Sequence, residues 1–136
     1  MTDEPDVRVE LAAESLRPGG ELAGAFVIAG GPPGDAESVE LSVLWHTSGK
    51  GTEDLAVVYY AAWTAADGTL SGMPNPHPFA VRLPRTPWSY DGELVKIHWV
   101  ARVRVRYGET GEVVREAPFT LSGTTDTPAE TRTDRQ

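Results

Sequence analysis

The sequence predicts an all-β fold, a β-sandwich of about seven antiparallel strands. In several segments apolar and polar residues alternate with period two, which is typical of strands that bury one face. Turns rich in glycine and proline separate these segments, and no segment shows a convincing helical period. A chain of 136 residues, 40% of them hydrophobic, fits one domain with one core. We therefore expect a sandwich over residues 7–121, between a flexible N-terminal leader (1–6) and a disordered C-terminal tail (122–136).

The first two strands are expected at residues 7–11 and 21–29. The turn Arg17-Pro18-Gly19-Gly20 separates them, because proline and paired glycines stop any helix there. Gly24 interrupts the second run, which indicates a bulge or a close approach of another backbone.

The next two strands, at residues 37–46 and 53–64, differ in their patterns. The first alternates cleanly, as expected for one buried face and one wet face. The second is apolar on both parities. We therefore expect this strand to be covered on both sides, or to have its second face in an interface. The polar segment 47–52 should be the turn that joins them.

The C-terminal half should contain a long loop and the longest strand. Residues 65–78 hold three prolines and two glycines, which predicts a loop. A short strand at 79–83 follows, and then a proline-bounded loop leads into the strictly alternating run 95–107. The last strand is expected at 113–121.

The longest strand carries Arg102, Arg104 and Arg106 on its polar parity. These side chains share one face at intervals of about 7 Å, which suggests a stripe that binds an anion or an acidic partner. Ordinary cross-strand pairing with the last strand is the alternative. A five-residue hairpin loop would place Arg104 opposite Glu116. A three-residue loop would pair Arg106 with Glu112 and Arg102 with Glu116. Either register would leave at least one arginine without a partner on that strand.

The aromatic residues Trp88 and Tyr90 lie in the loop before the longest strand. An exposed tryptophan between Pro87 and Ser89 could anchor a partner, because large rigid aromatic side chains dominate interface energetics. It could equally fold back as a lid over the end of the sandwich.

Composition and spacing argue against several classes of function. The formal charge of −8 disfavours nonspecific binding of nucleic acid or anionic membranes. The chain has no cysteine, and its three histidines, His46, His77 and His98, lack the spacing that metal sites favour. The segment Ser48–Thr52 fails as a phosphate loop because it joins two strands. No serine lies in a nucleophile-elbow pattern, and the carboxylates fall in turns, so we expect no catalytic residues, cofactor or metal.

The N-terminus lacks the basic start and apolar run of a secretory signal, and no window has the about 20 apolar residues of a membrane helix. We therefore expect a cytoplasmic protein that does not insert into membranes.

Three local patterns resemble the arrestin-like β-sandwich family of arrestins, the arrestin-like retromer subunit and sporulation-control proteins. They are the entry into a glycine-bearing strand at Arg17–Ile28, the alternation Val39–Trp45, and the proline loop Leu83–Gly92 with the strand Val95–Val100 after it. The resemblance covers roughly Val7–Leu121 and implies an immunoglobulin-like, arrestin-like sandwich. Arrestins and retromer subunits carry two such domains and this sequence shows one. The polar core that the family forms between its two domains is therefore not expected in this chain.

The resemblance implies a non-enzymatic interaction or scaffold module that binds a protein partner through sheet edges and loops. A homodimer could cover the apolar strand at 55–63. The candidate partner-binding residues are Trp88, Tyr90, Arg102, Arg104 and Arg106. Two alternatives stay open. One is a small-ligand carrier or enzyme with the 65–78 loop as a lid, and the other is a structural component of a larger assembly.

Overall fold

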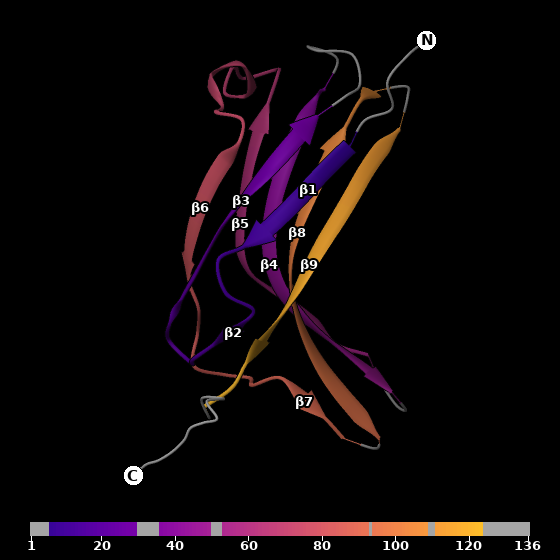
Figure 1. The fold of residues 1–136 in the computed structure, drawn as a ribbon. Coiled ribbons are helices and arrows are strands. Elements are labelled where there is room, and N and C mark those ends of the chain that lie inside the picture. The colour runs from indigo at the N-terminus through magenta and orange to yellow at the C-terminus, as the bar shows by residue number, and fades with distance from the viewer. Residues whose placement is uncertain (1–5, 30–35, 50–52, 93, 109–110, 124–136) are drawn as a thin grey trace.

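The computed structural model describes residues 6–29, 36–49, 53–92, 94–108 and 111–123, which form two β-sheets packed face to face (Figure 1). The predicted all-β sandwich is confirmed. The described residues include no α-helix, and a short 3₁₀ turn, η1 (Leu70–Gly72), lies between β5 and β6.

The smaller sheet has three strands in the order β1-β3-β6, with both pairs antiparallel. The strands are β1 (Asp6–Leu11), β3 (Glu21–Ala29) and β6 (His77–Arg82). Gly24 of β3 lies where a side chain would collide with the Glu10 carbonyl oxygen and the Phe79 ring. The pairing continues through it without a register shift, so Gly24 permits a close backbone approach rather than forming a bulge.

The larger sheet has the order β2-β9-β8-β4-β5, and β7 pairs with the start of β8. Its strands are β2 (Ser15–Leu16), β4 (Ser38–Gly49), β5 (Leu55–Thr64), β7 (Tyr90–Asp91), β8 (Val95–Arg106) and β9 (Glu112–Leu121). All of its pairs are antiparallel except β2 with β9, which run parallel. The ribbon formed by the end of β4, the start of β8 and β7 extends beyond the smaller sheet (Figure 1).

All seven predicted strands occur, with three differences. β4 continues to Gly49, into the predicted 47–52 turn, because β8 pairs with it as far as Val95. β6 begins at His77, inside the predicted 65–78 loop. Pro78 is tolerated there because β6 is an edge strand. The two-residue strands β2 and β7 were not predicted.

The first long strand, β1, begins at Asp6, and the last, β9, ends at Leu121. Asp6, assigned to the leader, is the first residue of β1, and the Ser122 N–H of the predicted tail donates to the Leu16 carbonyl. Residues 1–5 of the leader and 124–136 of the tail lie outside the described residues.

The core fills the space between the two sheets. Trp99 is the largest fully buried side chain, and it packs with residues of both sheets such as Leu22, Val81 and Phe119. A second cluster around Phe26, Leu41 and Val103 continues the core toward the opposite end. The apolar parity of each alternating strand therefore faces inward, as its sequence predicts.

Candidate functional site

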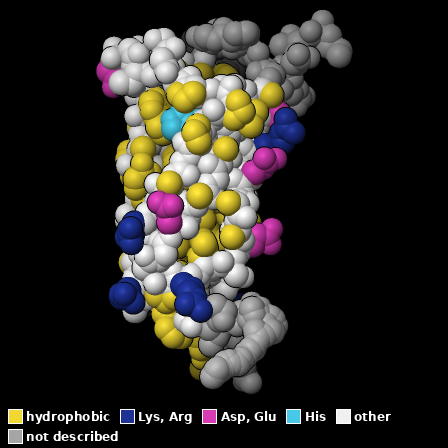
Figure 2. Space-filling view, turned by 60° about the vertical axis from the view of Figure 1, so that its left-hand side comes forward, with side chains coloured by type: hydrophobic (Ala, Val, Ile, Leu, Met, Phe, Trp, Pro, Cys, Tyr) yellow, Lys and Arg dark blue, Asp and Glu magenta, His cyan; other side chains and the backbone are white. Residues whose placement is uncertain are grey.

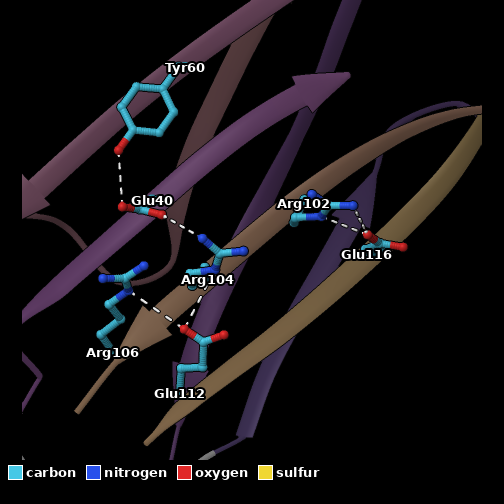
Figure 3. Close-up of polar contacts among 7 residues, drawn as sticks. All are labelled: Glu40, Tyr60, Arg102, Arg104, Arg106, Glu112 and Glu116. Carbon is cyan, nitrogen blue, oxygen red and sulfur yellow. Dashed lines mark hydrogen bonds and ion pairs between the residues drawn. The ribbon is translucent and has the colours of Figure 1, made fainter. Parts of the chain in front are cut away.

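The three predicted arginines lie on the outer face of the larger sheet, each close to a carboxylate (Figure 3). The β8–β9 register places Arg102 opposite Glu116 and Arg106 opposite Glu112, which is the register of the three-residue loop. The Arg102 Nε donates to Glu116 at 2.6 Å, and the Arg106 Nε lies 3.6 Å from Glu112.

The expectation that one arginine would lack a partner is wrong. Arg104 lies 3.5 Å from Glu40 of β4 and 3.7 Å from Glu112. Glu40 comes from the strand on the other side of β8, which the hairpin alone does not reveal. We call Arg102, Arg104, Arg106 and their three glutamates the arginine ladder. Its charges balance, so it offers an acidic ligand no excess of positive charge.

Tyr60 of β5 extends the arginine ladder by one polar contact. Its hydroxyl donates to Glu40 at 3.0 Å. Partial desolvation raises the pKa of Tyr60 above its ordinary value, and the hydrogen bond and negative charge of Glu40 add to the effect. The neutral hydroxyl is therefore the form that this contact favours.

Trp88 lies between the two predicted roles of anchor and lid. Its indole N–H donates to the Arg85 carbonyl at 3.0 Å, and the six-membered ring of the indole lies against Gly123, where a side chain would collide with it. The side chain nevertheless remains 48% exposed. The loop that carries it is tied to the core, because the Trp99 indole donates to the Pro87 carbonyl at 2.9 Å.

Tyr90 lies on β7, opposite Ile97 of β8, and is exposed. Arg102 is five residues further along β8, a distance of about 16 Å, and on the opposite parity of that strand. The structure therefore does not bring the predicted aromatic and arginine residues together in one site. Whether any of them contacts a partner stays a prediction.

The strand β5 lies at one edge of the larger sheet, and among the described residues it pairs only with β4. It contains no charged residue, proline or glycine, and none of its residues is buried. Leu55 and Tyr60 expose 56% and 58% of their surfaces. The first of the two expectations, that both faces are covered, is thus wrong within a single chain, and the second, that one face lies in an interface, stays a prediction. Hydrophobic side chains are visible on the side of the molecule that carries the edges β5 and β6 (Figure 2).

The open edge of β5 can be located residue by residue. The Thr47 N–H donates to the Asp54 carbonyl and the Ala65 N–H to the Glu37 carbonyl, each at 2.9 Å, which fixes the residues that face β4 at both ends of the pairing. In an antiparallel pair, alternate residues point their N–H and C=O groups away from the partner strand. These outward residues are Leu55, Val57, Tyr60 and Ala62, and within the described residues their backbone groups form no hydrogen bond across the open edge.

A bulge interrupts the regular spacing of this edge. Leu44 pairs with Val57 and Val43 with Tyr59, so Val58 is an extra residue in β5. Outward groups normally recur every second residue, but between Val57 and Tyr60 they are three residues apart.

The end of β5 is capped. The Thr64 N–H donates to Thr69 Oγ1 at 2.9 Å, and that hydroxyl donates to Asp67 at 2.6 Å. Hydrogen bonds from the Thr69 side chain and backbone lower the pKa of Asp67 from 3.8 to about 2. The open edge therefore ends at Ala62.

Two of the three histidines meet, because the strands that carry them are neighbours in the sheet. His46 and His98 are register partners with ring centroids 5.0 Å apart, and the Ser48 hydroxyl lies 2.8 Å from His98 Nε2. His77 stacks instead on Phe26, at 5.0 Å. Within the described ranges, no three His, Asp or Glu side chains converge as a metal site would require.

Grooves on the surface are open rather than enclosed. One of about 620 Å³ lies beside Tyr90, Lys96 and His98, where β7 and β9 meet β8. In the predicted lid, Leu70 and Met73 pack against the core. Over the described part of the chain, no helix is long and apolar enough to cross a membrane.

Comparison with known proteins gives a likeness of fold. No family model and no curated protein matches the chain. The structure is similar to the crystal structure of Spo0M, a sporulation control protein from Bacillus subtilis, with a TM-score of 0.58 and 16% sequence identity. The match covers 86% of this chain and 49% of Spo0M, so the chain spans about half the length of that protein. At this identity the likeness shows the fold alone, and it confirms the arrestin-like β-sandwich that the sequence patterns implied.

Proposed function

We propose that this chain is a non-enzymatic protein-interaction module that docks a partner strand along the open edge of β5. The observation that carries the proposal is the exposure of an uncharged, apolar edge strand. Natural edge strands are usually protected by charges, prolines or a covering segment, since an unprotected edge pairs with other chains. The residues from Leu55 to Ala62 have no such charge or proline.

Strand addition suits the chemistry of this edge. Outward N–H and C=O groups at Leu55, Val57, Tyr60 and Ala62 can supply backbone hydrogen bonds to an extended segment. The exposed side chains of Val57 and Tyr60 can then bury apolar surface against the same segment.

The fold likeness supports a regulatory role without identifying the process. Spo0M is named as a sporulation control protein, and a sandwich that presents edges and loops fits regulation by binding. The charge-balanced arginine ladder gives no comparable reason for docking, because its cations already face carboxylates.

The test is affinity capture with a tagged chain, followed by titration of each captured protein against purified variants. Val57→Lys should weaken binding at least 10-fold, because it places a charge on the docking edge. Leu94→Lys is the matched control, since Leu94 is 64% exposed and lies outside β5. Bound partner should also slow hydrogen exchange at the outward amides of β5. Binding that survives Val57→Lys but is lost when Arg102, Arg104 and Arg106 are changed to Gln would contradict the proposal.

A further inference from the structure

We propose that the strand that docks on β5 is the β5 strand of a second copy of this chain, in antiparallel orientation. In this register Leu55 lies opposite Ala62 of the other copy, and Val57 lies opposite Tyr60. The inference rests on the proposed function and specifies its partner.

The bulge at Val58 selects such a partner. A regular strand presents its backbone groups every second residue, so it cannot match the three-residue interval between Val57 and Tyr60. A second copy has the same interval. When the two strands run antiparallel about an axis between Val58 and Tyr59, the two intervals face each other and the outward groups on both sides of them align.

The same register matches the faces of the two sheets. Val57 pairs with Leu44 and Tyr60 with Ser42, both on the outer parity of β4, so these side chains lie on the outer face. Leu55 and Ala62, opposite His46 and Glu40, lie on that face too.

A two-fold axis perpendicular to the sheet would therefore keep both outer faces on one side and both cores on the other. Exposed Val57 then meets exposed Tyr60, a β-branched and aromatic cross-strand pair of the kind that stabilises sheets.

Charge favours the antiparallel orientation over the parallel one. Exposed Glu53 and Asp54 precede β5. In the proposed register they lie opposite Thr64 and Trp63, whereas in-register parallel pairing would place each carboxylate beside its own copy.

The large hydrophobic side chains that β5 exposes are Leu55, Val57, Val58, Tyr59 and Tyr60, far fewer than the about 20–30 residues per side of a standard interface. The dimer should therefore be reversible and concentration-dependent. Because each copy carries a formal charge of −8, added salt should tighten it.

Cysteine cross-linking tests the register directly, since the chain has no cysteine of its own. The variants Val57→Cys and Tyr60→Cys are oxidised separately and as an equimolar mixture. Opposed residues lie about 5.5 Å apart, within disulfide reach. Two copies of position 57 would lie about 10 Å apart, beyond the about 7 Å limit. We expect the mixture to form the mixed dimer at least 10-fold faster than either variant alone forms its own dimer.

Sedimentation velocity supplies the second readout. The unmodified chain should shift toward a dimer as its concentration or the salt concentration rises. Val57→Lys should abolish that shift and Leu94→Lys should preserve it. Fastest cross-linking by Val57→Cys alone would indicate parallel pairing and overturn the proposal, as would a monomer at every concentration.

These failures differ from failure of the proposed function. A monomeric chain that binds a different protein in a Val57-dependent manner would overturn only the self-pairing. A chain whose binding to every captured protein and to itself ignores Val57→Lys would overturn both.

Discussion

Two neighbouring regions of the larger sheet, the arginine ladder and the β5 edge, differ in whether their polar groups have partners within the chain. In the arginine ladder each arginine faces at least one carboxylate, and the Tyr60 hydroxyl donates a hydrogen bond to Glu40. Along β5, the outward backbone groups form no hydrogen bond across the open edge within the described residues, and large hydrophobic side chains are exposed. The arginines therefore have carboxylate partners within the chain, whereas the edge of the uncharged strand β5 has no strand paired with it among the described residues. An interaction surface is therefore better sought among unmatched groups than among charged ones.

The largest expected effect on the free energy of unfolding is at Trp63, and it distinguishes the packed end of β5 from its open edge. Trp63 packs toward the core, with its ring 4.7 Å from His77 and 6.1 Å from Phe26. Trp63→Ala should lower the free energy of unfolding by about 3 kcal/mol because it removes packing at a partly buried position. Tyr60→Ala, at an exposed position of the same strand, should cost less than about 1 kcal/mol. Denaturant unfolding measures both, and equal losses would show that β5 is not divided into a packed end and an open edge.

A smaller effect tests whether the arginine ladder is structural. Arg104→Met should destabilise the fold by about 1 kcal/mol, because it leaves Glu40 and Glu112 without the cation between them. The affinity of the Arg104→Met variant for a captured partner, and its sedimentation behaviour, should equal those of the unmodified chain. The double variant Arg104→Met with Glu40→Gln should recover part of the loss, since one of the uncompensated charges is then gone. An unchanged unfolding curve together with weakened partner binding would assign the arginine ladder to binding instead.

The smallest effect concerns the cap at the end of the open edge. Thr69→Val removes the acceptor for the Thr64 N–H. It should lower the free energy of unfolding by less than about 1 kcal/mol. The pKa of Asp67 should rise from about 2 toward 3.8, because the Thr69 hydroxyl no longer donates to it.

The sign of the pH effect follows from this lowered pKa. Asp67 contributes stability above its ordinary pKa of 3.8, and loses that contribution as the pH falls through about 2. The variant should show a smaller acid-dependent loss, because the Thr69 backbone and Thr64 still donate to Asp67. Unfolding curves at several pH values and NMR titration of Asp67 would show the difference. Thr69→Ser keeps a hydroxyl and is the control. A pKa that stays near 2 in Thr69→Val would mean that other groups hold the carboxylate.

The sequence was sufficient to predict the sandwich and its main strands, because the alternation of apolar residues is local and each turn is marked by glycine or proline. The β8–β9 register was narrowed to two choices, since loop length constrains a hairpin. The contribution of Glu40 could not be predicted, because it depends on β4 lying beside β8. The His46–His98 contact depends on the same arrangement.

The sequence predicted that one face of residues 55–63 could lie in an interface, but it did not predict that this segment is an edge strand. Apolar residues on both parities of residues 55–63 indicated a cover or an interface, but an edge strand and a central buried strand share that pattern. The bulge at Val58 has no mark in the sequence, because valine fits a regular strand equally well.

The bulge also bears on how this edge could change over evolutionary time. Deleting Val58 would restore an even interval and make β5 acceptable to ordinary strands, while the residues on both sides of the deletion would keep their present register partners on β4 and their present faces. Pairing selectivity on this edge is thus encoded in the length of the strand, so a single-codon deletion could redirect it where most substitutions could not.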